Sequence, residues 1–199
     1  NTNSKSIRIE AERLIKKSDL NWTILRPTMI YGTPNDRNMI KLIKWIDKVP
    51  FIPIFGKGDS LQQPIFVSDL AWSIVEIINN KNTFKKSFNL SGKEPITFNQ
   101  VINIISMYMG KKPLKIFLPY LIFVKVMRFF ELLGINFFIK SEQIKRLNED
   151  KNFSYSKATK IFGFRPRNFS EGILNEINIY KKNIKSSCCC SWWNKIYKL

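Results

Sequence analysis

The feature that most constrains the fold is a short β-rich stretch, residues 22–27 (WTILRP), between two amphipathic helical patterns. Its β-branched and aromatic residues favour a strand, and Pro27 ends the strand because proline cannot donate to a sheet ladder. Turn-forming residues follow at positions 33–36, TPND. We therefore expect an interior strand of a sheet that runs directly into a polar loop.

Helical periodicity flanks this strand on both sides. Apolar residues recur on one face of residues 4–17 and again on one face of residues 38–48. In the second helix that face consists of Ile40, Ile43 and Ile46. A third pattern covers residues 70–79, for which we expect Asp69 to be the N-cap. Its expected inward face consists of Leu70, Ile74, Ile77 and Ile78.

Proline and glycine exclude a helix from residues 49–67, so short extended pieces joined by a glycine turn are expected there. A short strand is expected at residues 87–92. Thr97 and Gln100 have the spacing of a capping box, and the helix that they open should end at Gly110. Strands that alternate with helices predict an α/β fold with parallel sheet, followed by a mostly helical second half.

The most apolar segment is residues 113–139. Lys125 and Arg128 interrupt it, and its longest uncharged run is too short to cross a bilayer, which takes about 20 residues. We expect a core helix or a lid helix here. The alternative is a helix at residues 117–138 that lies on a membrane surface.

The net charge of +18 raises the question of an anionic partner. The lysines are scattered, however, and no arginine stripe alternates with aromatic residues as in single-strand binders. We therefore expect a solvated basic surface, do not expect nucleic acid as a partner, and keep a membrane surface as an alternative.

The chain contains no histidine, which removes the commonest general base and the commonest metal ligand. Its three cysteines are adjacent, at positions 188–190, where they can form neither a spaced disulfide framework nor a good zinc site. We therefore expect no metal, and a reducing, cytoplasmic setting with attachment to the inner membrane as an alternative.

Both ends of the sequence are unusual. The first residue is Asn1, no signal peptide opens the chain, and we expect further sequence to precede it. Residues 186–199 differ in composition from the rest of the chain, and we expect a poorly ordered tail or a frameshift artefact there.

Four segments occur in an order that resembles a known family: IEAERLI…DLNWTILRPTMIYG, LQQPIFVSDLAWSIVEII, FNLSGKEPITFNQVI and KATKIFGFRPRNFSEGI. Together they are similar to the C-terminal portion of extended short-chain dehydrogenases. More narrowly, they resemble atypical NAD-dependent epimerase/dehydratase-like proteins, which include the NAD(P)H-holding accessory subunit of respiratory complex I.

The resemblance implies a domain organisation. Residues 1–110 would be the end of a Rossmann-like NAD(P)-binding domain with interleaved substrate-domain segments. Residues 111–185 would be a smaller, mostly helical substrate or lid region, and residues 186–199 would be the tail.

The resemblance also implies site residues at the carboxyl end of the strand, where open α/β sheets bind ligands. Pro27 and Thr28 would lie against the nicotinamide. Met29, Ile30 and Tyr31 would turn toward the substrate. Gln62 and Gln63 would lie at the rim of the cleft, and Gln62 stands near the place where nucleotide-sugar relatives carry a phosphate-binding arginine, so a charged phosphate contact is weakened.

Two parts of the family pattern are missing. No glycine-rich turn enters a helix, because the glycines at 56 and 58 are followed by Asp59. The catalytic Tyr-x-x-x-Lys pair would fall on Asn1 and Lys5 in one register, or on Ser4 and Arg8 in another, and neither supplies a tyrosine. Lys5 and Arg8 remain candidates for binding the cofactor through their positive charge. The weak catalytic candidates are Lys5, Arg8 and Tyr31.

Two functions follow as expectations. One is an NAD- or NADP-dependent epimerase, dehydratase or reductase that acts on a sugar-like or other alcohol or ketone, with a nucleotide sugar as one such substrate. The other is a non-catalytic NAD(P)H-binding accessory protein, with or without docking on a membrane surface. The sequence predicts no oligomeric state.

Overall fold

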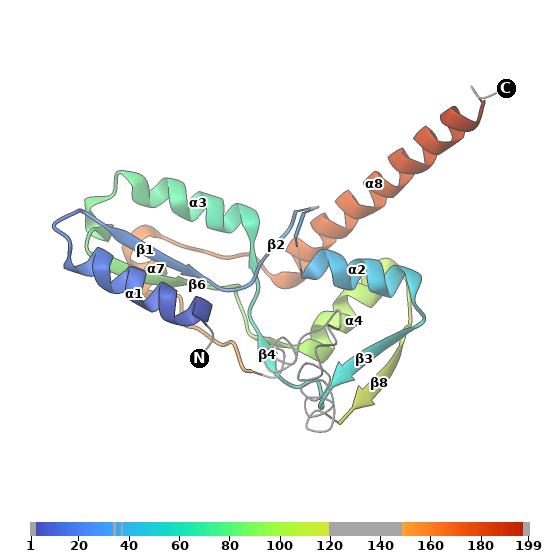
Figure 1. Cartoon of the computed structure of the whole chain (residues 1–199), viewed down its shortest axis with the longest axis horizontal. Coiled ribbons are helices and arrows are strands. Elements are labelled where there is room, and N and C mark those ends of the chain that lie inside the picture. Colours follow the sequence, from blue (N-terminus) through green and yellow to red (C-terminus); the bar gives the residue numbers. More distant parts are fainter. Residues whose placement is uncertain (1–2, 34, 37, 120–148, 197–199) are drawn as a thin grey trace.

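The structure is a computed structural model that describes residues 3–33, 35–36, 38–119 and 149–196. For residues 3–5 and 185–196 only the backbone is described. The described chain forms two packed regions, which meet where the chain leaves the first strand (Figure 1). The fold is α/β, as the sequence predicts.

The first region, called the sheet region below, is built on a parallel pair of strands. β1 (Thr23–Pro27) pairs with β6 (Lys86–Leu90) along its whole length. The helices around this pair are α1 (Asn3–Lys17), α3 (Val67–Ile78) and α7 (Ser156–Phe162) (Figure 1). The buried cluster of this region consists of Ile65, Phe88, Leu90, Ala158, Phe162 and Phe164.

The second region, called the helical region, packs three helices against a second parallel strand pair (Figure 1). The helices are α2 (Met39–Lys48), α4 (Phe98–Met109) and α8 (Phe169–Ile196), and the strands are β3 (Phe51–Phe55) and β8 (Leu114–Leu118). Its cluster is the larger one. The buried members are Tyr31, Met39, Ile40, Ile43, Ile46, Ile52, Ile54, Phe66, Val101, Ile102, Ile105, Phe169, Ile173, Ile177 and Tyr180.

Two short strand pairs complete the fold between these regions. β2 (Ile30–Tyr31) pairs in parallel with β5 (Ile65–Phe66). β4 (Leu61–Gln62) pairs in antiparallel with β7 (Ile96–Thr97). A 3-10 turn, η1 (Lys81–Thr83), precedes β6.

Local sequence signals predict several element ends correctly. The capping box is confirmed, because the Thr97 side chain accepts from the Gln100 N–H while the Gln100 Oε1 accepts from the Thr97 N–H. Gly110 ends α4 in the left-handed conformation, with φ of 66°. The predicted apolar face of α2 is buried.

The expectation of a helix from residue 113 onward is wrong at its start. Leu114–Leu118 forms strand β8, because the edge of β3 offers it a parallel partner. Residues 120–148, which include most of the expected lid or membrane-surface helix, lie outside the described residues. Among the helices that the structure describes, none is long and apolar enough to cross a membrane.

Two further expectations are wrong in the sheet region. β1 has one strand neighbour, β6, among the described residues, so here it is an edge strand and not an interior one. On α3, Ile74 and Ile78 are exposed, because the sheet lies under the face that carries Leu70 and Ile77. The remaining face of α3 is open to solvent.

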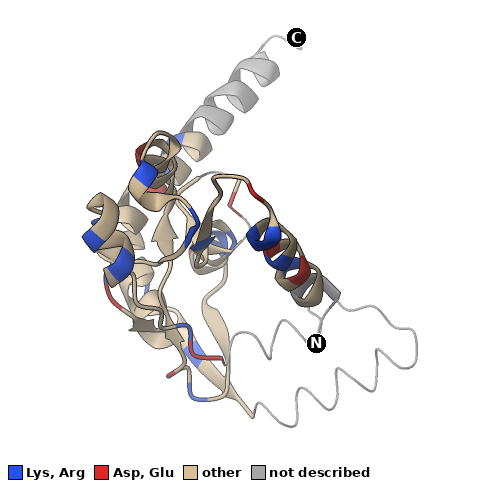
Figure 2. Cartoon of the chain, turned by 90° about the vertical axis from the view of Figure 1, so that its left-hand side faces the viewer, with Lys and Arg blue, Asp and Glu red and all other residues tan. Residues whose placement is uncertain are grey.

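The basic residues are spread over several elements, without one continuous stripe in the view of Figure 2. At the C-terminal end, the backbone of residues 186–196 continues α8, where the sequence predicts a poorly ordered tail.

Candidate functional site

The candidate site is built on residues 28–32, where the chain leaves β1 and changes its strand partner. The Thr28 N–H donates to the Leu90 carbonyl at 2.9 Å, so the chain still follows β6 there. The Met29 carbonyl then accepts from the Ile65 N–H at 2.9 Å, and β2 continues beside β5. This segment, residues 28–32, is called the crossing below. It lies at the carboxyl end of a parallel strand pair, where open α/β sheets bind ligands.

The structure brings Pro27, Thr28 and Gln63 together at this crossing. Pro27 is exposed at the end of β1, opposite Leu90. The Thr28 hydroxyl donates to the Gln63 carbonyl. Thr28 therefore has its hydroxyl proton in use, and its remaining hydroxyl lone pairs are what it can offer a ligand.

The two predicted glutamines have different surroundings, although both are buried. Gln63 uses both ends of its amide: Nε2 donates to the Gly92 carbonyl and Oε1 accepts from the Phe153 N–H, each at 2.8 Å. Gln62 accepts from the Lys151 Nζ at 3.4 Å, while its buried Nε2 has no partner in the described part of the chain. Gln63 therefore has a structural role, and Gln62 holds an unused donor.

Tyr31 is enclosed and does not face solvent. Its ring lies edge-on to Phe66, with centroids 5.4 Å apart, and its hydroxyl donates to the Phe169 carbonyl at 3.4 Å. Burial, followed by the charge of Asp69, raises the pKa of the phenol. This surrounding opposes a phenolate, so Tyr31 is poorly placed to act as a general base.

The neighbours of Tyr31 in the crossing differ in exposure. Met29 packs against the cluster of the helical region. Ile30 is 39% exposed. Ile30 is therefore the apolar side chain of the crossing that a ligand can reach.

Glycine is required on both sides of Tyr31. Gly32 has φ of +110°, and a Cβ there would lie 2.3 Å from the Phe66 ring. A Cβ at Gly172 would lie 2.2 Å from the Tyr31 hydroxyl. These two close approaches allow α8 to pack directly on the crossing.

Lys5 and Arg8 lie in the first half of α1. The side chain of Lys5 is outside the described residues, and Arg8 is exposed. Further along the helix, side chains of α1 and β1 line a hollow of about 460 Å³. Its lining consists of Ile9, Glu12, Arg13, Lys16 and Arg26. Among the described residues, no hydrogen bond or ion pair joins Arg8 to the crossing, so its role stays a prediction.

Asp69 is not the cap of α3, which corrects the sequence-based expectation. It lies inside the first turn, and Phe66 holds the cap position. Its two carboxylate oxygens accept from the Arg167 Nε at 2.9 Å and from the Arg167 backbone N–H at 3.0 Å. The Arg167 guanidinium also lies 4.4 Å from the centre of the Phe66 ring. The pair ties α3 to the segment before α8, directly beside Tyr31.

Sequence reasoning missed Glu176, which is fully buried on α8. Its Oε2 accepts from the Gly32 N–H at 3.0 Å. Burial raises the pKa of this carboxyl to about 8, and the charge of Asp36 acts in the same direction. The available signal was an acidic residue between Ile173 and Ile177 on the apolar face of a predicted helix.

Curated relatives match different lengths of the chain, while no family model matches it. The UDP-glucuronate 4-epimerase of Thermodesulfobacterium geofontis is 28% identical over 83% of the chain and 45% of its own length. An Arabidopsis thaliana protein, chloroplast stem-loop binding protein of 41 kDa b, is 30% identical over 46% of the chain and 25% of its own length. NADH dehydrogenase [ubiquinone] 1 alpha subcomplex subunit 9 of Dictyostelium discoideum is 30% identical over 47% of the chain and 26% of its own length.

Solved structures superpose on most of the chain. The dTDP-glucose 4,6-dehydratase of Bacillus anthracis, solved in complex with NAD, matches 93% of the chain and 54% of its own length, with a TM-score of 0.70 and 15% identity. The chain has the fold of the extended short-chain dehydrogenases. The UDP-glucuronic acid 4-epimerase of Bacillus cereus, in complex with UDP-glucuronic acid and NAD, matches with a TM-score of 0.65 and 21% identity, over 88% of the chain and 50% of its own length.

The comparisons confirm the resemblance drawn from the four sequence segments, because relatives and structural neighbours are epimerases, dehydratases and the complex I subunit type. The chain spans about half, or less, of the length of these proteins.

Proposed function

We propose that this chain supplies the substrate side of an NAD(P)-dependent epimerase or dehydratase whose substrate is a nucleotide sugar or a similar alcohol or ketone. The observation that carries the proposal is the change of strand partner at residues 28–32, which opens the carboxyl end of β1. The length and order of the match to a UDP-glucuronate 4-epimerase favour this chemistry.

The residues of the chain fit one end of the cofactor. Pro27 and Thr28 would contact the nicotinamide, and the cofactor, when bound, would accept and return hydride. The glycine turn at positions 56–58 follows strand β3 and is succeeded by β4, so it does not form a phosphate cradle at a helix start. The proposal therefore assigns this chain the nicotinamide end and the sugar, and no part of the pyrophosphate.

Gln62 is the residue that we assign to the sugar or its neutral polar groups. Its buried Nε2 has no partner among the described residues, and leaving such a donor unpaired costs about 1–3 kcal/mol. A ligand oxygen that accepts from Nε2 would recover part of this cost.

The test is a pair of variants of neighbouring glutamines in the full chain. Gln62→Met removes the unpaired donor at similar volume, so we expect unchanged or higher stability but about 5- to 10-fold weaker binding of UDP-glucuronate, measured by calorimetry. Gln63→Met breaks two formed hydrogen bonds and should lower the free energy of unfolding by about 1–3 kcal/mol. Equal affinity of Gln62→Met and wild type would contradict the assignment, as would no binding of UDP-glucuronate or UDP-glucose to the wild type.

A second candidate is a non-catalytic NAD(P)H-binding accessory role. It is favoured by the absence of tyrosine from the expected Tyr-x-x-x-Lys positions, by the enclosed phenol of Tyr31, and by the match to the complex I subunit. Nicotinamide fluorescence on titration with NADH and NADPH, followed by assays with UDP-sugars, separates the two. Nucleotide binding without sugar turnover would support the accessory role, and turnover would exclude it.

A further inference from the structure

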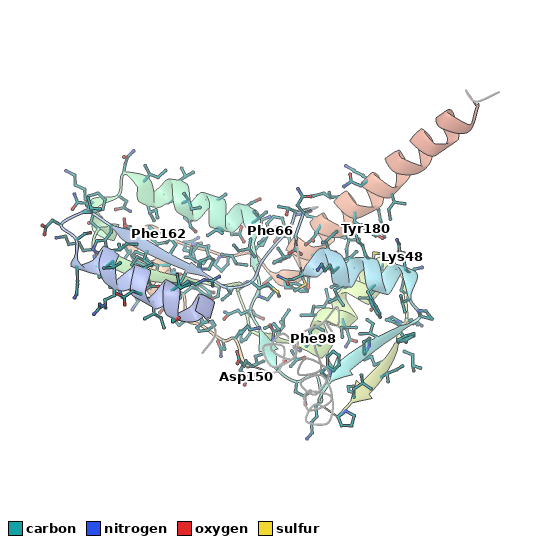
Figure 3. The ribbon with its side chains drawn as sticks, in the orientation of Figure 1. Lys48, Phe66, Phe98, Asp150, Phe162 and Tyr180 are labelled. Atoms are coloured by element: carbon teal, nitrogen blue, oxygen red, sulfur yellow. The ribbon has the colours of Figure 1, made fainter. Side chains whose placement is uncertain are left out.

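Helix α8 is packed onto the crossing segment more closely than ordinary side chains permit. Gly172 lies against the Tyr31 hydroxyl, where a Cβ would approach to 2.2 Å, and Phe169 accepts the hydrogen bond of that hydroxyl through its carbonyl. Figure 3 shows Phe66 at this junction and Tyr180 further along α8. The first two turns of α8 therefore form one wall of the crossing.

A buried carboxyl group extends this contact by one more turn. Glu176 is fully buried, and its Oε2 accepts from the Gly32 N–H at 3.0 Å. Its other oxygen, Oε1, is buried and has no hydrogen-bond donor among the described residues. The side chain of Asp36 faces the same carboxyl from the loop before α2.

The geometry indicates which of the two carboxyls carries a proton. Asp36 accepts from two backbone N–H groups near the start of α2, those of Asn38 at 3.0 Å and Ile40 at 2.9 Å. Glu176 has one donor for two oxygens, and a charge on this buried carboxyl, beside the carboxyl of Asp36, is unfavourable. A proton on Glu176 removes the repulsion and gives it an O–H that can donate to Asp36.

We propose that Glu176 is a positioning residue that holds the Tyr31–Gly32 turn against α8, and that it does so as a neutral acid hydrogen-bonded to Asp36. The turn carries Tyr31 and lies beside the exposed Ile30, so the placement of the proposed substrate surface depends on this bond. The inference rests on the proposed function only in that it links the turn to substrate.

Loss of the proton changes the surroundings of the turn. The titratable groups that act on this position in the described residues are Asp36 before α2 and Tyr31 in β2, while Tyr180, on α8 itself, donates its hydroxyl to Asp47. In the described part of the chain, no lysine or arginine forms an ion pair with Glu176. Ionisation therefore places a second negative charge beside Asp36 in a buried site, and the α8 contact weakens.

The test is nuclear magnetic resonance of the full chain, without ligand, from pH 5 to 9. We expect the Glu176 side-chain carbonyl carbon and the Gly32 amide nitrogen to titrate together with a midpoint near 8, the value to which the carboxyl is shifted. Asp36→Asn removes the like charge and should lower this midpoint. A Glu176 midpoint at its ordinary value near 4.5 would overturn the proposal.

Two variants of Glu176 test whether the side chain holds the turn through its hydrogen bond or only fills space. Glu176→Gln retains size and an acceptor for the Gly32 N–H, so the protection of that amide against hydrogen exchange, relative to its intrinsic rate, should stay high and should not change with pH. Glu176→Ala should expose the amide and speed its exchange about tenfold relative to the core amide of Ile105. Exchange as fast in Glu176→Gln as in Glu176→Ala would contradict the proposal, and the wild-type titration decides it if Glu176→Ala does not fold.

A measurement of ligand affinity against pH separates this inference from the proposed function. If UDP-glucuronate binds, its affinity should fall between pH 7 and 9 in the wild type and stay constant in Glu176→Gln. Absence of binding at every pH would remove the proposed substrate class, while the titration of Gly32 would still support or overturn the role of Glu176.

Discussion

The two regions of the molecule bury their apolar residues to different degrees. The helical region has a cluster of fifteen buried residues, and the sheet region has a cluster of six. The outer helices of the sheet region leave large apolar side chains exposed: Ile7, Ile9, Leu14 and Ile15 on α1, and Trp72, Ile74, Val75 and Ile78 on α3. Among the described residues, most of the buried apolar side chains therefore lie in the helical region.

Strand pairing differs less than burial does. Each region contains one five-residue parallel pair, β1 with β6 and β3 with β8. A two-stranded pair is marginal without packing on its faces, and in the helical region β3 and α4 both contribute residues to the larger cluster. Because the two regions share this pairing but differ in burial, we expect them to differ in stability.

The largest expected effect comes from two matched isoleucines, Ile102 and Ile65, both fully buried. Ile102→Ala leaves a cavity in the larger cluster, and we expect it to lower the free energy of unfolding by about 3–5 kcal/mol. Ile65→Ala lies in the smaller cluster, which has more room to relax, and should cost about 2–3 kcal/mol. Urea denaturation measures both. A larger loss for Ile65→Ala would reverse the comparison, and Ile78→Ala, at an exposed position, should change stability by less than about 0.5 kcal/mol.

The second effect concerns the pH dependence of the contact between α8 and the crossing. Burial raises the pKa of Glu176 from 4.5 to about 8, so the folded protein keeps a proton that the unfolded chain releases at lower pH. Stability from this group is therefore highest at low pH, falls as the pH rises through this window, and levels off above about 8. We expect a loss of about 2–4 kcal/mol in urea denaturation between pH 5 and 8.

The control for this prediction is Glu176→Gln, which has no proton to lose. Its stability curve should lie above that of the wild type at pH 8 and converge with it toward pH 5. Parallel curves for the two proteins across this range would show that Glu176 does not carry the effect.

The third effect concerns the tie between the two regions. Asp69→Ala leaves the Arg167 guanidinium and its backbone N–H without their carboxylate partner, and we expect a loss of about 1–3 kcal/mol, since the arginine side chain remains 27% exposed. Thermal or urea unfolding would measure it. Asp69→Asn keeps an acceptor and should cost less, and Asp19→Ala, at an exposed aspartate, should cost almost nothing. A loss in Asp69→Ala no larger than in Asp19→Ala would show that the pair contributes nothing.

Elements governed by neighbouring residues could be predicted from the sequence. The periodicity of residues 38–48, the strand ended by Pro27 and the capping box from Thr97 to Gln100 each depend on residues within about one or two turns of one another. The position of the crossing followed from the resemblance of its segment to a known family. The role predicted for Gln63 at the rim of the cleft stays a prediction, and its two hydrogen bonds to Gly92 and Phe153 had no local signal.

Predictions failed where the structure or contacts of a segment depend on a part of the chain that is distant in sequence. Leu114–Leu118 has the composition of a buried helix or a strand, and the free edge of β3 selects the strand. Asp69 fits the pattern of an N-cap, and Arg167 binds it instead. Ile74 and Ile78 fit an inward face of α3, and the orientation of that helix on the sheet leaves them exposed.

The sequence by itself determined the α/β class, most element boundaries and the segment at which the chain leaves β1, because backbone propensity, periodicity and capping act between neighbouring residues. Only the tertiary structure decided that Asp69 meets Arg167 and that Glu176 meets Gly32, across sequence separations of 98 and 144 residues. A charged or buried state depends on what surrounds a side chain in space, and residues so far apart become neighbours only when the helices and strands pack.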